Sequence, residues 1–219
     1  MSQFLHRAGL LYTRPAVAIS LTDSATVGAS GGVATFTSSA LGAAAADRWI
    51  YVVATSRVDV NISALTIGGN AAQVVAGPVR NTGPSPDSAC AIYRLLEPSG
   101  TTATITVTMA GSSAPSTAIT IYRVVGGIGQ IFDSATEATN GAATGSVSLN
   151  IPARGGAIAG IGNNGTSAVT WTNITEDTDF ANGSDRHSAA SRVDVNKLTA
   201  LAISNSAGVN SSLCAVAIR

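Results

Sequence analysis

The chain has 219 residues, of which 12 are basic and 12 acidic, so its formal net charge is zero. Charged residues make up 11% of the chain, against about 25% in an average soluble domain. This balance, with Lys197 as the single lysine, argues against binding to nucleic acid, which needs a clustered excess of basic residues. No apolar run approaches the ~20 residues of a transmembrane helix. We therefore expect no nucleic-acid partner and no membrane span. Such low charge favours a subunit held in an assembly.

Residues 1–15 differ in composition from the rest of the chain, because they are apolar and basic and contain no acid. Arg14-Pro15 ends the apolar run too early for a secretory signal, so none is expected. An apolar segment exposed to water would tend to associate non-specifically with other proteins, so we expect this one to be buried. Two alternatives stay open: a first strand or short helix on its own core, or an arm that docks on a partner. The arm residues that would contact a partner are Phe4, Leu5, Arg7, Leu10, Leu11, Tyr12 and Arg14.

From residue 16 onward, short β-prone runs alternate with clusters of Gly, Ser, Asn, Asp and Pro. The strongest run is Arg48 to Thr55, which is apolar and β-branched almost throughout and predicts a central strand buried on both faces. In the run from Thr102 to Met109, threonines alternate with apolar residues, which predicts a strand with one face in water. About twelve such runs with almost no helical periodicity predict an all-β fold.

We therefore predict an antiparallel β-sandwich, jelly-roll-like, with a short N-terminal arm. Residues 1–15 would form the arm and residues 16–219 a single β-sandwich domain. Two smaller sandwiches remain an alternative at this chain length. The hexamer Ser-Arg-Val-Asp-Val-Asn occurs at both 56–61 and 191–196. Since the flanking residues do not match, we interpret the two copies as similar strand-to-turn transitions and treat duplication of half-domains as the alternative.

The residues that usually carry catalysis are sparse. His187 has no Gly-x-Ser-x-Gly elbow to complete a hydrolase triad. Cys90 and Cys214 lie in strand-like runs, where two reduced cysteines packed as small hydrophobes are favoured over a disulfide. The acidic stretch 176–185 lacks EF-hand spacing and is interpreted as a solvated loop tip. We expect no catalytic residue, no cofactor and no metal site, and predict that the protein is not an enzyme.

Two segments could instead contact a ligand on the surface. The first is the proline-rich stretch 77–88, which cannot enter a sheet interior and should project as a loop. The second is the acidic stretch 176–185, together with Trp171, which lies between two threonines and is the tryptophan that we expect to be more exposed. The candidate ligand-contact residues are Pro84, Pro86, Trp171, Asp177, Asp179 and Asp185.

Four segments carry a resemblance to a known group of proteins: Ala40-Leu41-Gly42-Ala43-Ala44-Ala45-Ala46-Asp47-Arg48, Leu65-Thr66-Ile67-Gly68-Gly69-Asn70-Ala71-Ala72, Ala91-Ile92-Tyr93-Arg94 and Ile119-Thr120-Ile121-Tyr122-Arg123-Val124. Together with the rhythm of strands and turns over residues 30–219, this pattern resembles virion accessory proteins of tailed bacteriophages and gene-transfer-agent-like particles. These have β-sandwich or jelly-roll bodies. The motifs are structural, so the resemblance transfers no functional residue.

The resemblance implies a non-enzymatic structural protein of the virion, assembled in the host cytoplasm. We expect a capsid decoration or cement subunit, or a head fibre, attached to the shell through its arm or a sheet edge. Its partners would be the major capsid protein or another virion protein, and further copies of itself, with a trimer preferred. The alternative is a tail-fibre or tail-tip module for host attachment that binds a receptor or a host-surface glycan.

Overall fold

The structure is a computed structural model. It describes residues 15–57, 60–82, 87–112, 116–142, 144–165, 167–182, 185–194, 199–206 and 210–219, with the backbone alone for 199–206. The predicted arm contacts from Phe4 to Arg14, together with Pro84 and Pro86, lie outside the described residues.

The described chain consists of seventeen strands and no helix. The first nine are β1 (Ala18–Val27), β2 (Val33–Ala40), β3 (Trp49–Arg57), β4 (Ile62–Ile67), β5 (Asn70–Ala71), β6 (Gln73–Arg80), β7 (Ser88–Leu96), β8 (Thr102–Met109) and β9 (Ser116–Val125). The other eight are β10 (Ile131–Asn140), β11 (Thr144–Ile151), β12 (Gly156–Asn163), β13 (Thr170–Thr172), β14 (Thr175–Asn182), β15 (Asp185–Val193), β16 (Thr199–Ser206) and β17 (Asn210–Ile218). All named pairings are antiparallel, so the predicted all-β, antiparallel fold is confirmed.

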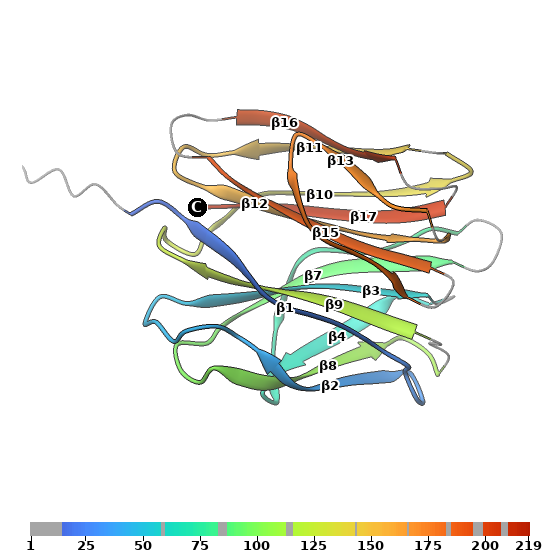
Figure 1. Ribbon diagram of the computed structural model, residues 1–219, viewed down its shortest axis with the longest axis horizontal. Helices are drawn as coiled ribbons and strands as arrows, with labels where there is room; N and C mark the ends of the chain where they lie inside the picture. The colour runs from blue at the N-terminus through green and yellow to red at the C-terminus, as the bar shows by residue number, and fades with distance from the viewer. Residues whose placement is uncertain are drawn as a thin grey trace, which may run out of the picture.

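The strands form four sheets stacked as layers (Figure 1). Sheet A has the order β1-β9-β3-β7-β6 and lies against sheet B, with the order β2-β8-β4-β5. Sheet C has the order β10-β17-β12-β15-β14 and lies against sheet D, with the order β11-β16-β13. Sheets A and B form a first sandwich and sheets C and D a second, and the two sandwiches meet through sheets A and C.

The two sandwiches have the same strand order. If β5 is set aside and each half is numbered along the chain, sheets A and C both read 1-8-3-6-5, and sheets B and D both read 2-7-4. This resembles the order of a jelly roll, in which two Greek keys form facing sheets, except that the fifth strand of each half lies beside the sixth in the inner sheet and not beside the fourth. The hexamer copies lie at the ends of β3 and β15, the third strand of one half and the sixth of the other. The repeated hexamer therefore does not mark the repeated topology.

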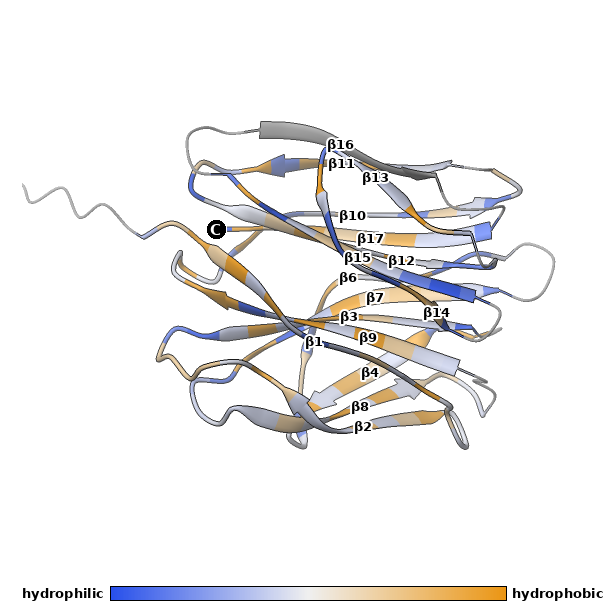
Figure 2. Cartoon of the chain, viewed as in Figure 1, coloured by the Kyte–Doolittle hydropathy of each residue, from blue (hydrophilic) through white to orange (hydrophobic). Residues whose placement is uncertain are grey.

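Three hydrophobic cores hold the layers together. In β3, Ile50 and Val52 pack into the core between sheets A and B. Tyr51 and Val53 of the same strand pack into the core between sheets A and C. A third core, which includes Leu149, fills the space between sheets C and D. Because β3 is the middle strand of a sheet covered on both sides, it is buried on both faces as predicted. Figure 2 shows further hydrophobic stretches on β7 and β9 of the same layer.

A fully buried arginine fastens the loops at one end of the first sandwich. The guanidinium of Arg48 donates hydrogen bonds to the backbone carbonyls of Gly42, Glu97 and Ser99. These bonds tie the loop before β3 to the loop after β7. A buried cation with several carbonyl acceptors is strongly held, because losing them would leave its charge unpaired in a region without water.

Candidate functional site

The candidate docking site is a groove on one side of the molecule, between the edge strands of the two inner sheets. Strand β6 is the edge of sheet A and β10 is the edge of sheet C, so each has one side without a neighbouring strand in the part of the chain that the structure describes. Between them lies a groove of about 350 Å³, lined by residues 74–78 of β6 and 134–136 of β10. This volume is at the lower end of the roughly 300–1,000 Å³ of ligand sites.

Two polar contacts involve the residues just before and just after the part of β6 that lines this groove, Gln73 and Asn81. At one end, the guanidinium of Arg94 stacks over Trp49 at 4.4 Å and donates to the side-chain oxygen of Gln73 and the carbonyl of Gly129. At the other end, the backbone N–H of Asn81 donates to the hydroxyl of Ser212 over 2.9 Å.

The lining of the groove is polar, with apolar side chains beside it. Ser134 and Thr136 are exposed, and no described ionisable side chain lines the groove. Val74, which lines it, is 42% exposed, and Phe132, two residues before Ser134, is 43% exposed. An open strand edge with neighbouring apolar side chains can bind an extended peptide by adding it as a further strand.

Irregularities in β6 restrict that pairing. The register of β6 against β7 shifts between Val74 and Ala76 and again between Ala76 and Val79. Pro78 has no N–H to donate. Natural edge strands use bulges and prolines in this way against uncontrolled pairing. The groove is therefore suited to a short matched segment and not to an unlimited sheet.

A buried histidine lies between the two sandwiches. His187 of β15 is fully buried, with Nδ1 2.7 Å from the hydroxyl of Thr55 and Nε2 2.7 Å from the hydroxyl of Thr120. Burial lowers the pKa of His187 to about 3, so the ring is neutral near pH 7. Since a neutral imidazole has one donor and one acceptor nitrogen, the two threonines satisfy both. His187 thus joins sheet C to two strands of sheet A.

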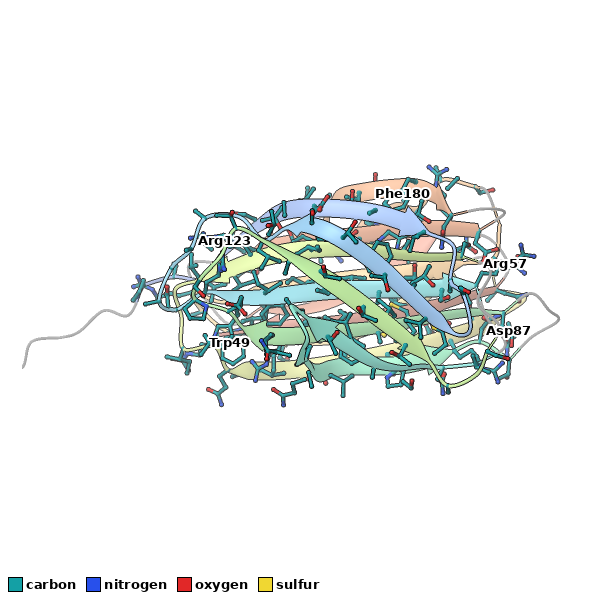
Figure 3. The ribbon with its side chains drawn as sticks, turned by 90° about the horizontal axis from the view of Figure 1, so that it is seen from below. Trp49, Arg57, Asp87, Arg123 and Phe180 are labelled. Carbon is teal, nitrogen blue, oxygen red and sulfur yellow. The ribbon has the colours of Figure 1, made fainter. Side chains whose placement is uncertain are left out.

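A second polar contact between the sandwiches is incompletely satisfied. The carboxylate of Asp185 is buried, 3.5 Å from Nε of Arg57, and neither of its oxygens accepts a hydrogen bond from the described residues. Burial raises the pKa of Asp185 to about 6, an effect partly opposed by the charge of Arg57. Figure 3 shows Arg57 at the same end of the molecule as Asp87 and opposite to Trp49. At this end, β6 connects to β7 and β14 connects to β15.

The acidic stretch is not a loop tip, and that expectation is wrong: Thr175–Asn182 forms β14, the edge strand of sheet C. Asp177 accepts a hydrogen bond from the hydroxyl of Tyr122 over 2.9 Å. Asp179 holds the guanidinium of Arg186 with contacts of 2.6 and 2.9 Å. These acids are used inside the fold, which a pattern of charges along the sequence cannot reveal.

The other candidate ligand residues are dispersed. Trp171 packs against the core between sheets C and D and donates from Nε1 to the hydroxyl of Ser188 over 2.7 Å. The proline-rich stretch begins inside the edge strand β6, so only its later part connects two strands. The groove was not predicted from the sequence, because it depends on two edge strands about sixty residues apart in the chain.

Within the described residues, no group of three or more His, Cys, Asp or Glu side chains could hold a metal ion. The described chain also has no helix that could span a bilayer. No known family model matches the sequence, and no curated protein is similar to it.

Proposed function

We propose that the protein is a structural subunit of a bacteriophage-type virion, of the capsid decoration, cement or head-fibre class. The resemblance of the sequence to virion accessory proteins supports the assignment to a virion. The low content of charged residues supports a subunit that is part of an assembly. The observation that carries the proposal is the groove between β6 and β10, where two open strand edges lie next to exposed apolar side chains.

In this proposal the groove receives an extended segment of a shell protein. Backbone pairing along β6 or β10 supplies the affinity, while the irregular register of β6 limits which segments fit. Residues 1–15 provide a second attachment, because their apolar and basic side chains are suited to a partner surface. At its end, Pro15 already contacts the body, where its carbonyl accepts from the N–H of Gly127 over 3.3 Å.

Binding to shells tests this function directly. Purified protein is mixed with shells assembled without it, and co-sedimentation is measured. Thr136→Lys places a charge in the groove and is expected to weaken binding at least tenfold. Thr35→Lys is the matched control, since Thr35 is an exposed threonine on β2, far from the groove. Equal binding of both variants, or no binding of the parent to any shell, would contradict the proposal.

A receptor-binding or glycan-binding module is the second candidate. Its support is that β6 and β14 both finish at the end of the two sandwiches where Arg57 contacts Asp185. Binding on a glycan array that is lost in Pro84→Ser/Pro86→Ser and kept in Thr136→Lys would favour this candidate over attachment through the groove.

A further inference from the structure

The only two cysteines of the chain face each other where the two sandwiches meet. Cys90 lies on β7 of sheet A and Cys214 on β17 of sheet C, and both are fully buried. The thiol of Cys214 donates to the carbonyl of Cys90 over 3.2 Å. The thiol of Cys90 donates to the carbonyl of Gly160 over 3.3 Å. Gly160 is the cross-strand partner of Cys214, so each thiol reaches the backbone of the opposite sheet at the same point.

Small residues allow the sheets to approach closely at this point. Facing sheets usually lie about 10 Å apart, too far for most disulfides, whose Cα atoms are about 4.4–6.8 Å apart. Here a Cβ on Gly160 would lie 2.0 Å from a methyl carbon of Val53. A Cβ on Gly77, where φ is +79°, would lie 2.9 Å from the sulfur of Cys214. Gly160 thus allows Val53 of the facing sheet to approach its backbone, and Gly77 leaves room for the sulfur of Cys214.

The surroundings also explain why the thiols persist in the folded chain. Burial, and then the interaction with Cys90, raise the pKa of the Cys214 thiol well above its usual range. A protonated and shielded thiol reacts slowly, because the thiolate is the nucleophile. Oxidation therefore requires that the pair be exposed, as it is while the chain folds.

We propose that Cys90 and Cys214 are a latent disulfide site that joins the two sandwiches when the chain folds in an oxidising solution. With glutathione disulfide as oxidant, one cysteine thiolate attacks it and releases one glutathione. The second cysteine then displaces the other glutathione and forms the bond between the two sulfurs. In total the two cysteines lose two electrons and two protons. Glutathione disulfide takes up both electrons and both protons and becomes two molecules of reduced glutathione.

The bond would connect residues 124 positions apart and so restrict the unfolded chain strongly. Closure of a loop of this size gives a stabilisation of about 5 kcal/mol. For a chain of this length, that stabilisation corresponds to a rise in melting temperature of roughly 10 °C. Because each sandwich contributes one cysteine, the bond would also connect the two sandwiches covalently. It does not depend on the proposed virion function.

Refolding tests the site without requiring access to the native interior. Reduced, denatured protein is refolded in parallel in a glutathione redox buffer and in dithiothreitol. Intact mass, thiol content and melting temperature are then measured. We expect the first sample to lose two hydrogen atoms, to have no free thiol and to melt at the higher temperature. Dithiothreitol added to the unfolded oxidised sample should remove the difference.

Cys90→Ser and Cys214→Ala are the controls, because neither can close the bond, and each should melt equally in both buffers. The comparison of the parent with itself in two buffers remains valid even if a variant does not fold. A native parent that keeps both thiols in the oxidising buffer would overturn the proposal. So would an oxidised chain that is misfolded or melts no higher than the reduced one.

Discussion

Substitution of Asp185 by asparagine is expected to stabilise the protein at neutral pH. In the folded chain this carboxylate is buried and accepts no hydrogen bond from the described residues, and burial raises its pKa from 3.8 to about 6. The folded state therefore binds the proton more tightly than the unfolded state does. The resulting stabilisation is present in full below pH 3.8 and is lost as the pH rises through about 6. A shift of this size corresponds to about 3 kcal/mol between the two extremes.

Asparagine does not ionise, so Asp185→Asn should raise the free energy of unfolding by about 2–3 kcal/mol at neutral pH. Between about pH 7.5 and pH 4.5, the parent regains about 2 kcal/mol of this difference as Asp185 takes up its proton. The measurement is urea-induced unfolding of both proteins across this range. Because every other titrating group is common to both, their difference isolates Asp185. A difference that stays constant with pH would refute the reasoning.

Arg57→Gln provides the control for the cause of the shift. The charge of Arg57 lowers the pKa of Asp185, against the larger effect of burial. In the Arg57→Gln variant, the pKa of Asp185 should therefore be higher, and the pH range over which protonation of Asp185 restores stability should move upward. A downward shift of this pH range would mean that the pKa of Asp185 is not set by burial and by the charge of Arg57.

Three further substitutions test the packing. His187→Leu removes the hydrogen-bond partner of the Thr55 hydroxyl and one of the two partners of the Thr120 hydroxyl, which still contacts Thr178. The substitution should cost about 2–4 kcal/mol in urea unfolding at neutral pH. This loss should shrink below about pH 6, because burial lowers the pKa of His187 to about 3 and makes the parent itself less stable in acid. Arg48→Met removes three buried hydrogen bonds and should cost about 3 kcal/mol, whereas Arg154→Met, at an exposed site, should cost less than about 0.5 kcal/mol. Gly160→Ala should lower the melting temperature by roughly 5 °C, because the added methyl group collides with the side chain of Val53. The double variant Gly160→Ala/Val53→Ala should regain part of this loss. A melting temperature lowered by the sum of the two single effects would contradict this explanation.

The sequence patterns predicted the strands better than they predicted the number of sheets. The alternation from Thr102 to Met109 correctly indicated a strand with one face in a core, because sheet B is an outer layer. The run after Arg48 correctly indicated a strand buried on both faces. Four other strands without alternation, β7, β9, β12 and β17, lie in the inner layers. Such strands read as continuous apolar or small-residue runs, and several of them together indicate more layers than one sandwich provides.

The candidate site and the polar contacts could not be predicted in the same way. The role of His187 as a buried link between sheets A and C depends on its hydrogen bonds to Thr55 and Thr120. These threonines are 132 and 67 positions away in the chain. The acids of β14 were mistaken for a loop because their charge suggested solvent, although Tyr122 and Arg186 engage two of them. Contacts between distant strands depend on how sheets A and C face each other, and a local pattern contains no information on that.

The repeated strand order gives this molecule the form of a dimer made from a single chain. Residues 126–130 join the halves, so the second half is always present beside the first at a high effective concentration. Such a pair does not come apart on dilution, unlike two separate chains with the same contact area. Its halves are also free to diverge, since a substitution in one is not copied into the other. The groove lies between the fifth strand of the first half and the first strand of the second, β6 and β10. The equivalent pair is β14 and β1, where the hydroxyl of Thr26 donates to the side-chain oxygen of Asn182, so the two equivalent places already differ in their side chains.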